Sequence, residues 1–465
     1  MKHTPHGYWL EEAGAVAPAP PLEGDRDADV VVVGGGFTGL WAAWHAIQLQ
    51  PDARVVLLEA GACGHGPSGR NGGFCNVMWF SLPTMRARWG DEAALAVARA
   101  ADRAVGEIGE FCEQEGVDAW FRRGGYLQVS TAAAHDQVWA AALAACEELG
   151  AADSVRALSE AEVAARCVSP GFRAGVLYPH AATVQPARLA LGLRDRLRAR
   201  GVELFESTPV RALHDRAGGV EARTATGSVR AGTAVLAIGG AVKSWRGPLR
   251  DRLSIASSHI VLTEPVPDVI EAAGWTGGEC ITDSRALVDY FRTTPDGRIA
   301  FGWGGGRIAA GARLRGRAEL DAAVIAATAG HLHECFPGLA GRRITHAWGG
   351  PIDASPTHLP MVVPLPGGRA FAAAGYTGNG VGPSQMVGRT LASLALDRRD
   401  EPSRLAFVDP SGPRVPPEPL QWLGAEAIRA GILAKEDAEL AGRRPGRVAS
   451  AVARVPELIG FHIGR

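Results

Sequence analysis

The sequence predicts an α/β fold (α+β overall), with a Rossmann-like nucleotide-binding domain of discontinuous segments, a mixed-sheet domain and a helical C-terminal extension. Three observations predict it. An apolar run, a glycine-rich turn and a helix-forming stretch follow one another in "VVVGGGFTGLWAAWHA", Val31–Ala46. The same succession recurs in Arg369–Leu396. Short β-type runs separated by Gly, Asp and Ser turns lie between the two.

The positions of these features divide the chain. Dinucleotide-type features at both ends imply that the cofactor domain is assembled from separate segments. We expect an N-terminal arm at 1–27, the cofactor domain at 28–85, 184–245 and 346–400, the mixed-sheet domain at 86–183 and 246–345, and the extension at 401–465.

Bulk composition excludes several classes of protein. The 465 residues carry a formal net charge of −1, so no strong field favours nucleic acid or an anionic membrane. The seven cysteines are scattered without a CxxC pair, which fits reduced thiols in the cytoplasm. The N-terminal residues show no signal-peptide pattern, and no run reaches about 18 apolar residues.

The first predicted elements form a βαβ unit. Asp29–Val33 is expected to be a short buried strand, Phe37–Gln50 a helix and Arg54–Leu58 a second strand, which ends at Glu59.

The turn in this unit carries the spacing G-x-G-x-x-G. Gly34 permits a tight turn, Gly36 lets the backbone approach a pyrophosphate, and Gly39 lets the helix pack closely on the strand. Glu59 lies 20 residues after Gly39, where a carboxylate accepts the two ribose hydroxyls and disfavours a 2′-phosphate. These residues predict FAD or NAD. The alternatives are a tight turn without a ligand and an ordinary acid at a strand end.

The following elements are predicted from periodicity and turn signals. "PDG" at 295–297 fits a hairpin. We expect helices at 91–116, 132–150, Pro186–Arg200, 320–336 and Glu418–Ala441, and a strand at Gly125–Ser130.

Three further segments favour a flavin over a nicotinamide. "GPSGRNGG", Gly66–Gly73, would lie along a diphosphate, although a solvent loop is the alternative. Ala234–Trp245 is an apolar strand that ends in two glycines and would abut the nucleotide. In Ala372–Arg389 a glycine-rich turn precedes a helix whose positive end would stabilise a reduced flavin ring.

With these segments in view, the sequence resembles the FAD-dependent D-amino acid oxidase (glycine/sarcosine oxidase-like) superfamily. The resemblance rests on "VVVGGGFTGL", "LLEAGACGHGPSGRNGG", "FRTTPDGRIAFGWGGG", "WGGPIDASPTHLPMV" and "AGYTGNGVGPSQMVGR". "PPLEGDRDADVVVVGGGFTGL", "SGRNGG" and "FCEQEGVDAWFRRGGYL" are most similar to the branch of gamma-glutamylputrescine oxidases and aminophosphonate oxidoreductases. The likeness runs from about residue 8 to about residue 445.

The resemblance implies FAD and a mixed sheet that covers the flavin. It implies hydride transfer from a C–N bond to flavin N5, followed by hydrolysis of the imine. By position, the expected FAD contacts are Gly34, Gly36, Phe37, Thr38, Gly39, Glu59, Ala60, Ser68, Arg70, Asn71, Gly72, Val210, Gly239, Gly375, Gly378, Asn379, Gly380 and Val381.

Two departures from the family pattern bear on the flavin's linkage and reoxidation. Arg70 stands where some relatives carry a linking histidine, and "WGGPID" holds no cysteine, so we expect non-covalent FAD, with His65 or Cys63 as the alternative. Several relatives place a lysine over the flavin for reaction with O2; Ala300 occupies that position here. The chain has three lysines, at positions 2, 243 and 435, so the acceptor is either O2 or another molecule.

Four residues are candidates for substrate chemistry. Tyr290 and Arg292 would share one face of a strand, where Arg292 would bind a carboxylate or phosphonate and Tyr290 would close the pocket. His259 would help to deprotonate the substrate ammonium or assist reaction with O2. Trp348 would wall the flavin. The alternatives are an interface arginine, a core histidine and a core tryptophan.

The sequence therefore predicts an FAD-dependent oxidoreductase for a small primary or secondary amine. The alternatives are a flavin monooxygenase and a non-catalytic FAD-bound subunit. No metal is expected, because His331 and His333 would not share a helix face. The basic C-terminal helices are expected to form a docked pair, with a membrane surface as the alternative. The sequence leaves the oligomeric state open.

Overall fold

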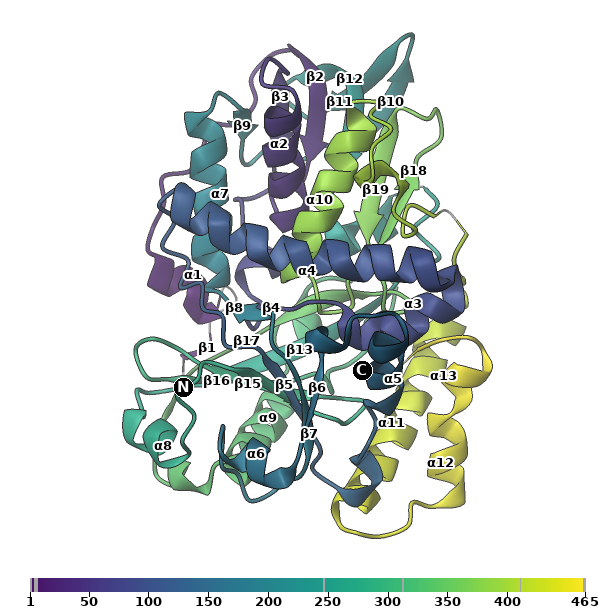
Figure 1. Cartoon of the computed structure of the whole chain (residues 1–465). Coiled ribbons are helices and arrows are strands. Elements are labelled where there is room, and N and C mark those ends of the chain that lie inside the picture. The colour runs from purple at the N-terminus through teal and green to yellow at the C-terminus, as the bar shows by residue number, and fades with distance from the viewer. Residues whose placement is uncertain (1, 4–6, 246, 312, 410, 463–465) are drawn as a thin grey trace.

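We analysed a computed structural model of the chain, which describes residues 2–3, 7–245, 247–311, 313–409 and 411–462. Parts of the predicted N-terminal arm (1, 4–6), mixed-sheet domain (246, 312) and C-terminal extension (410, 463–465) lie outside the described residues. Two sheets, one above the other in Figure 1, form the framework of the molecule.

The first sheet is the nucleotide-binding one predicted at the N-terminus. β2 pairs in parallel with β3 on one side and with β12 on the other. The run Val30–Val33 is buried on both faces, as expected of a central parallel strand. Its strands are β2 (Arg26–Val33), β3 (Val55–Leu58), β9 (Glu203–Phe205), β10 (Ala212–Arg216), β11 (Gly219–Arg223), β12 (Ser228–Leu236), β18 (Met361–Pro364) and β19 (Ala370–Ala374).

Helices pack on this sheet, and the residues buried between the helices and the sheet form the largest hydrophobic core. α2 (Phe37–Leu49) and α10 (Val381–Ala395) pack against each other, and α4 (Asp91–Gln114) crosses α10 (Figure 1). Gly388 makes the close packing possible, because a Cβ there would come within 2.5 Å of the Trp41 Cβ. α7 (Pro186–Ala199) packs on the other side of α2.

The second sheet is mixed and contains nine strands within the described residues. Its longest pairing joins β13 and β17 in antiparallel register, from Ser254 opposite Ala354 to Thr263 opposite Ile344. In spatial order the strands are β1 (Lys2–His3), β17 (Ile344–Ala354), β13 (Ser254–Thr263), β16 (Ile299–Trp303), β15 (Asp289–Thr293), β14 (Cys280–Asp283), β5 (Tyr126–Val129), β7 (Gly175–Tyr178) and β6 (Arg156–Leu158). A separate ribbon joins β4 (Phe74–Cys75) and β8 (Ala182–Thr183).

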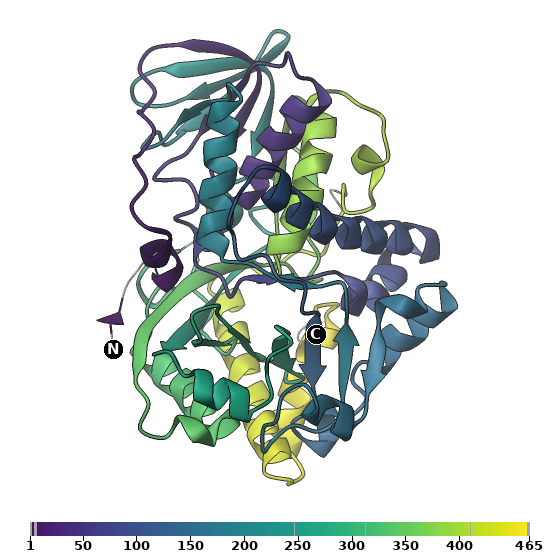
Figure 2. The same ribbon diagram turned by 60° about the vertical axis from the view of Figure 1, so that its left-hand side comes forward.

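The remaining helices surround the mixed sheet. The C-terminal ones lie together at its side, as the yellow ribbons of Figures 1 and 2 show. Their bounds are α1 (Gly7–Ala13), α3 (Leu82–Trp89), α5 (Ala140–Glu148), α6 (Glu160–Ala164), α8 (Pro267–Ala272), α9 (Ala322–Cys335), α11 (Leu420–Leu440), α12 (Arg447–Ala453) and α13 (Val455–Leu458).

The predicted α/β architecture is confirmed, with differences at particular elements. The first βαβ unit is present, and β15 and β16 form the hairpin around 295–297. The helix expected at 132–150 is shorter, because a 3₁₀ turn at Ala133–His135 precedes α5. The expected domain boundary at 346 falls inside β17, which belongs to the mixed sheet.

The N-terminal arm is fixed to the nucleotide-binding sheet. Arg194 and Glu206 form a buried ion pair at 3.0 Å. Arg194 also donates to the Ala17 carbonyl, and Glu206 accepts from the Ala19 backbone N–H. The arm is therefore part of the folded structure between Gly14 and Asp25, although it forms no helix or strand there.

Candidate active site

A cavity of about 1150 Å³ lies between the two sheets. The carboxyl ends of β2, β3 and β12 line one end, β13 and β17 line its middle, and α11 lines the other side. Ligands of open α/β sheets bind at the carboxyl ends of the strands, so the cavity lies where a nucleotide is expected.

Glycines shape the wall of the cavity between β2 and α2. Gly34 has φ +111°, and a Cβ there would lie 2.3 Å from the Ala237 carbonyl oxygen. A Cβ on Gly39 would lie 1.9 Å from the Gly34 carbonyl oxygen. Gly36 immediately precedes α2, whose first backbone N–H groups carry the partial positive charge that holds a diphosphate.

Glu59 follows β3 and borders the cavity. Its two carboxylate oxygens accept from the backbone N–H groups of Gly35 and Gly61, each at 2.7 Å. Burial raises the pKa of Glu59, against the effect of these two hydrogen bonds. A carboxylate has about four acceptor positions, so this fixed group retains capacity for ribose hydroxyls.

The turn at Gly66–Gly73 is held by its own side chains. Ser68 Oγ accepts from the Phe37 N–H at 2.9 Å, which joins the turn to the start of α2. Asn71 donates to the carbonyls of Pro67 and Ser68. Arg70 lines the cavity, and its guanidinium lies 3.5 Å from Glu319. The turn is therefore an ordered wall of the cavity.

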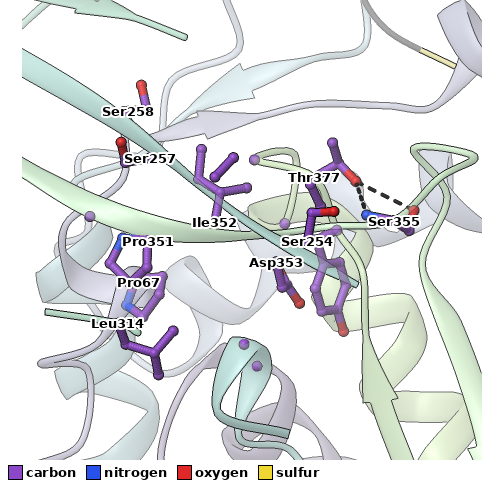
Figure 3. A pocket seen from close by; sticks show the side chains of 18 of the residues that line it. Pro67, Ser254, Ser257, Ser258, Leu314, Pro351, Ile352, Asp353, Ser355 and Thr377 are labelled. Carbon is purple, nitrogen blue, oxygen red and sulfur yellow. Dashed lines mark hydrogen bonds between the residues drawn. The ribbon is translucent and has the colours of Figure 1, made fainter. Parts of the chain in front are cut away.

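The other glycine-rich turn, before α10, meets the end of β17. The Asp353 carboxylate accepts from the Gly375 N–H at 2.7 Å. Figure 3 shows Asp353 beside Ser254 on the cavity wall and Thr377 bonded to Ser355. Burial raises the pKa of Asp353 to about 6. The sequence does not single out Asp353, because this residue stands alone in an apolar segment.

The structure brings most of the predicted cofactor residues to this one cavity. Gly39, Gly375 and Asn379 do not line it; the first two support the turns, and Asn379 accepts from Asn76 at 3.2 Å. The residues that line it are Gly34, Gly36, Phe37, Thr38, Glu59, Ala60, Ser68, Arg70, Asn71, Gly72, Val210, Gly239, Gly378, Gly380 and Val381.

Comparison with protein families decides the identity of the nucleotide. The family described as FAD dependent oxidoreductase (DAO) matches residues 29–394. The chain belongs to this family. Its cofactor is accordingly FAD, and the predicted family membership is confirmed.

Individual relatives agree with this assignment. The chain is 28% identical to the probable oxidoreductase OrdL of Rhizobium meliloti, over 85% of this chain and 90% of the relative. It is 27% identical to gamma-glutamylputrescine oxidoreductase of Escherichia coli, over 84% and 89%. Glycine oxidase from Geobacillus kaustophilus has a similar fold, with a TM-score of 0.66 at 18% identity, over 81% of this chain and 96% of that one.

The residues present fit FAD. The cavity exceeds the 300–1,000 Å³ of ordinary small-ligand pockets, as a dinucleotide requires. At Gly34 and Gly39 a Cβ would collide with neighbouring backbone in the turn between β2 and α2. The carboxylate of Glu59, held by two backbone N–H groups, follows the adjacent strand β3. Glu59, Gly36 and the start of α2 would hold the adenosine diphosphate part. The turn before α10 would hold the flavin end.

Tyr290 is the predicted catalytic residue that the structure places on the cavity wall. Its hydroxyl lies 2.7 Å from Ser258 Oγ, and Ser258 donates to the Trp303 carbonyl at 2.8 Å. Because serine has a single proton to donate, Tyr290 is the donor toward Ser258. The tyrosine oxygen therefore keeps acceptor character on the cavity side.

Arg292 does not line the cavity, and this differs from the expectation. Its side chain is 2% exposed and donates to the carbonyls of Gly73, Val184 and Thr293. Burial lowers its pKa to about 10. Arg292 shares a strand face with Tyr290, but it is turned into the joint between the sheets, as in the alternative of an interface arginine.

His259 also lies outside the cavity. On β13 the cavity is lined by Ser254, Ala256, Ser258 and Ile260, and also by Ser257, but not by His259, whose side chain lies on the opposite face of the strand from Ser258. Its Nε2 accepts from the Asp321 N–H at 3.0 Å, and burial lowers its pKa to about 4. The structure thus shows a neutral core histidine.

Trp348 supports the cavity from behind. It is fully buried, packs edge-on against Trp9, and donates from Nε1 to the Arg70 carbonyl at 2.8 Å. Trp9 donates to the Asn71 carbonyl at 2.8 Å. Trp348 therefore positions the Gly66–Gly73 turn without lining the cavity itself.

The residues considered for flavin linkage and oxygen reaction fall in different places. His65 borders the cavity, whereas Cys63 is fully buried and burial raises its pKa. Ala300 is buried in a hydrophobic cluster that also contains Trp9. Lys243 lies beside the cavity wall and donates to the Leu253 carbonyl at 2.6 Å.

The C-terminal helices contribute to the cavity, which the sequence did not predict. α11 contributes Gln421, Ile428, Arg429 and Ile432 among other residues. A helix with an apolar stripe gives no signal for which surface it covers, so this contribution is visible only in the fold. Within the part of the chain that the structure describes, no helix is long and apolar enough to cross a bilayer.

Proposed function

We propose that this protein is an FAD-dependent amine oxidoreductase, which oxidises the C–N bond of a small primary or secondary amine. The imine product then hydrolyses to an aldehyde or ketone. The observation that carries the proposal is the hydrogen-bonded Tyr290–Ser258 pair on the wall of the same cavity that begins at Glu59. The names of the relatives support amine or amino-acid substrates, since they include gamma-glutamylputrescine oxidoreductase and glycine oxidase.

The side chains suggest how an amine is oriented. FAD, when bound, supplies the two-electron acceptor. Tyr290 accepts a hydrogen bond from the substrate nitrogen, because its own proton is engaged by Ser258. Asp353 lies at the flavin end of the wall, and with its pKa raised to about 6 it is a carboxylate suited to receive a proton from an ammonium group.

The electron acceptor is proposed to be O2 or another molecule, with slow reaction toward O2. By the resemblance, Ala300 stands where several relatives carry a lysine, and it is buried in the same hydrophobic cluster as Trp9. The flavin is proposed to be non-covalent, since Arg70 stands where some relatives carry a linking histidine and Cys63 does not line the cavity; a link through His65, which borders the cavity, is the alternative. A cytoplasmic location agrees with the free state of all seven cysteines, none of which forms a disulfide.

The test is anaerobic mixing of the purified holoprotein with a panel of amines. The panel contains alkylamines, amino acids, acylated polyamines and aminophosphonates. Loss of the visible flavin absorbance with one class supports the proposal, and admission of air then measures the rate of reoxidation. If no amine bleaches the flavin, the proposal fails.

Two other functions make different predictions. A flavin monooxygenase would oxidise NADH or NADPH, so bleaching by either coenzyme without an amine would favour it. A non-catalytic FAD-bound subunit would respond to neither, and substitution of Tyr290 would leave its properties unchanged.

A further inference from the structure

The helix α11 lies outside the residues that match the family, yet it forms one wall of the cavity. The family match ends at residue 394, and α11 runs from Leu420 to Leu440. Gln421, Ala425, Ile428 and Ile432 line the cavity at intervals of three and four residues, which places them on one helix face. The C-terminal extension therefore supplies this wall of the cavity, and the segment that matches the family does not.

Polar contacts fix α11 to the segments around the mixed sheet. Gln421 Nε2 donates to Ser254 Oγ at 2.7 Å, at the start of β13. Glu436 is 4% exposed and accepts from the Ala286 N–H at 2.6 Å, in the loop before β15. The helix is thus fixed at both ends against strands that carry cavity residues.

Arg429 lies between these two contacts and lines the cavity. Its Nε lies 2.9 Å from the Gly305 carbonyl oxygen and 3.0 Å from that of Gly306, and its Nη2 lies 2.6 Å from Gly305. Its Nη1 makes no hydrogen bond to the residues that the structure describes. One edge of the guanidinium is fixed, and the Nη1 side remains available.

The charge of Arg429 has no directly paired carboxylate in the described part of the chain. The carboxylates that act on it electrostatically, Glu426 and Asp321, are both in ion pairs with Arg307. Partial burial lowers the pKa of Arg429. A half-buried cation without a carboxylate of its own favours an anionic ligand.

The fixed edge of Arg429 lies close to the Tyr290 site. A Cβ on Gly302 would collide with the Tyr290 ring, and the Trp303 carbonyl accepts from Ser258. Gly305 follows Gly302 by three residues, which is at most about 11 Å along the chain. The end of β16 therefore contacts Tyr290 and Ser258, and the residues directly after the strand contact Arg429.

We propose that Arg429 binds an oxyanion group of the substrate, so that the enzyme takes amines carrying a carboxylate or phosphonate. This inference rests on the proposed amine oxidation and names the substrate class within it. The oxyanion accepts hydrogen bonds from Nη1 and from the second proton of Nη2, while the amine lies toward Tyr290. The C-terminal extension thereby determines specificity.

The test measures binding of small non-oxidisable probes to the oxidised holoenzyme through the change in its visible flavin spectrum. The probes are propionate, methylphosphonate and the neutral propionamide. In R429Q the glutamine amide retains a donor for the Gly305 carbonyl without the charge, and R429K retains the charge. The matched control on the same helix is K435Q, since Lys435 pairs with Glu439 and does not line the cavity.

We expect at least one anion to bind the wild-type enzyme and K435Q, with propionamide at least about tenfold weaker. R429Q should weaken anion binding at least about tenfold and leave propionamide unchanged, and R429K should restore part of the loss. FAD content and thermal midpoint check that each variant is folded. The proposal is overturned if neither anion binds, if R429Q binds it as the wild type does, or if R429Q loses propionamide and anion equally.

The outcome separates this inference from the proposed function. Arg429-dependent anion binding without oxidation of any amine would leave the oxyanion site in place and refute amine oxidation. Oxidation of simple alkylamines as fast as of their carboxylated analogues, in wild type and R429Q alike, would support amine oxidation and refute the oxyanion site.

Discussion

The two ends of the cavity are built in different ways. At the nucleotide end, backbone forms the wall: Gly34 and Gly39 leave no room for a Cβ, and Glu59 is fixed by two backbone N–H groups. At the substrate end, side chains from β13, β15 and α11 form it. Where the wall is made of backbone, a residue with a larger side chain does not fit. Where the wall is made of side chains, another side chain can take the place of the present one. The sequence of the nucleotide end is therefore constrained by one cofactor, whereas the residues of the substrate end can vary with the substrate.

The largest expected effect is at Gly34. In G34A the new Cβ would lie 2.3 Å from the Ala237 carbonyl oxygen at φ +111°, so β2 and β12 must separate. We expect loss of FAD binding and a loss of stability of several kcal/mol. FAD content and thermal denaturation measure this. G330A is the control, because a Cβ there meets nothing within 4 Å; a yellow, stable G34A would contradict the backbone argument.

Substitution of Arg292 shows whether this buried arginine stabilises the fold or binds the substrate. R292M removes the donor to three carbonyls, so we expect a loss of about 3 kcal/mol in the free energy of unfolding. Denaturant unfolding measures it, with the exposed Arg343→Met as the control, expected within about 0.5 kcal/mol. A stable R292M that has lost only substrate affinity would restore the substrate role that the sequence suggested.

Tyr290 tests the substrate end directly. In Y290F the acceptor for the substrate nitrogen is lost while the ring remains, so kcat/KM for the amine should fall about tenfold with stability almost unchanged. Steady-state kinetics and thermal denaturation measure the two quantities. Tyr8→Phe is the control, because the Tyr8 hydroxyl bonds to Asp296. Unchanged kcat/KM in Y290F would mean that another group holds the amine.

A pH-dependent effect is expected at Asp353. Its pKa is raised in the folded state from 3.8 to about 6, so the folded protein binds this proton more tightly than the unfolded chain. The contribution to stability is therefore fully present at pH below 3.8 and is lost as the pH rises through about 6, by about 3 kcal/mol. Denaturant unfolding of wild type and D353N across this range measures it; identical pH profiles would show that Asp353 is not buried in this way.

The same contrast explains what the sequence could predict. The sequence predicts the nucleotide end because the shape of one cofactor requires Gly34, Gly36 and Glu59 at a fixed spacing. The strand pattern around His259 does not show which face meets the cavity, and the register of β13 puts Ser258 and Ile260 there instead. Tyr290 and Arg292 share one face of β15. The sequence does not show that the Arg292 side chain is buried and bonded to the Gly73 and Val184 carbonyls instead of lining the cavity. Arg429 joins the site through tertiary docking of a helix, for which no local pattern exists.

One feature has a practical meaning for handling the protein. Near the N-terminus, Trp9 donates to the Asn71 carbonyl and packs on Trp348, beneath the Gly66–Gly73 turn. Near the C-terminus, Ile459, Phe461 and His462 line the cavity. A tag joined closely to either of these segments would therefore lie near residues that form or support the cavity wall, and a flexible spacer followed by tag removal is the safer way to purify an unperturbed enzyme.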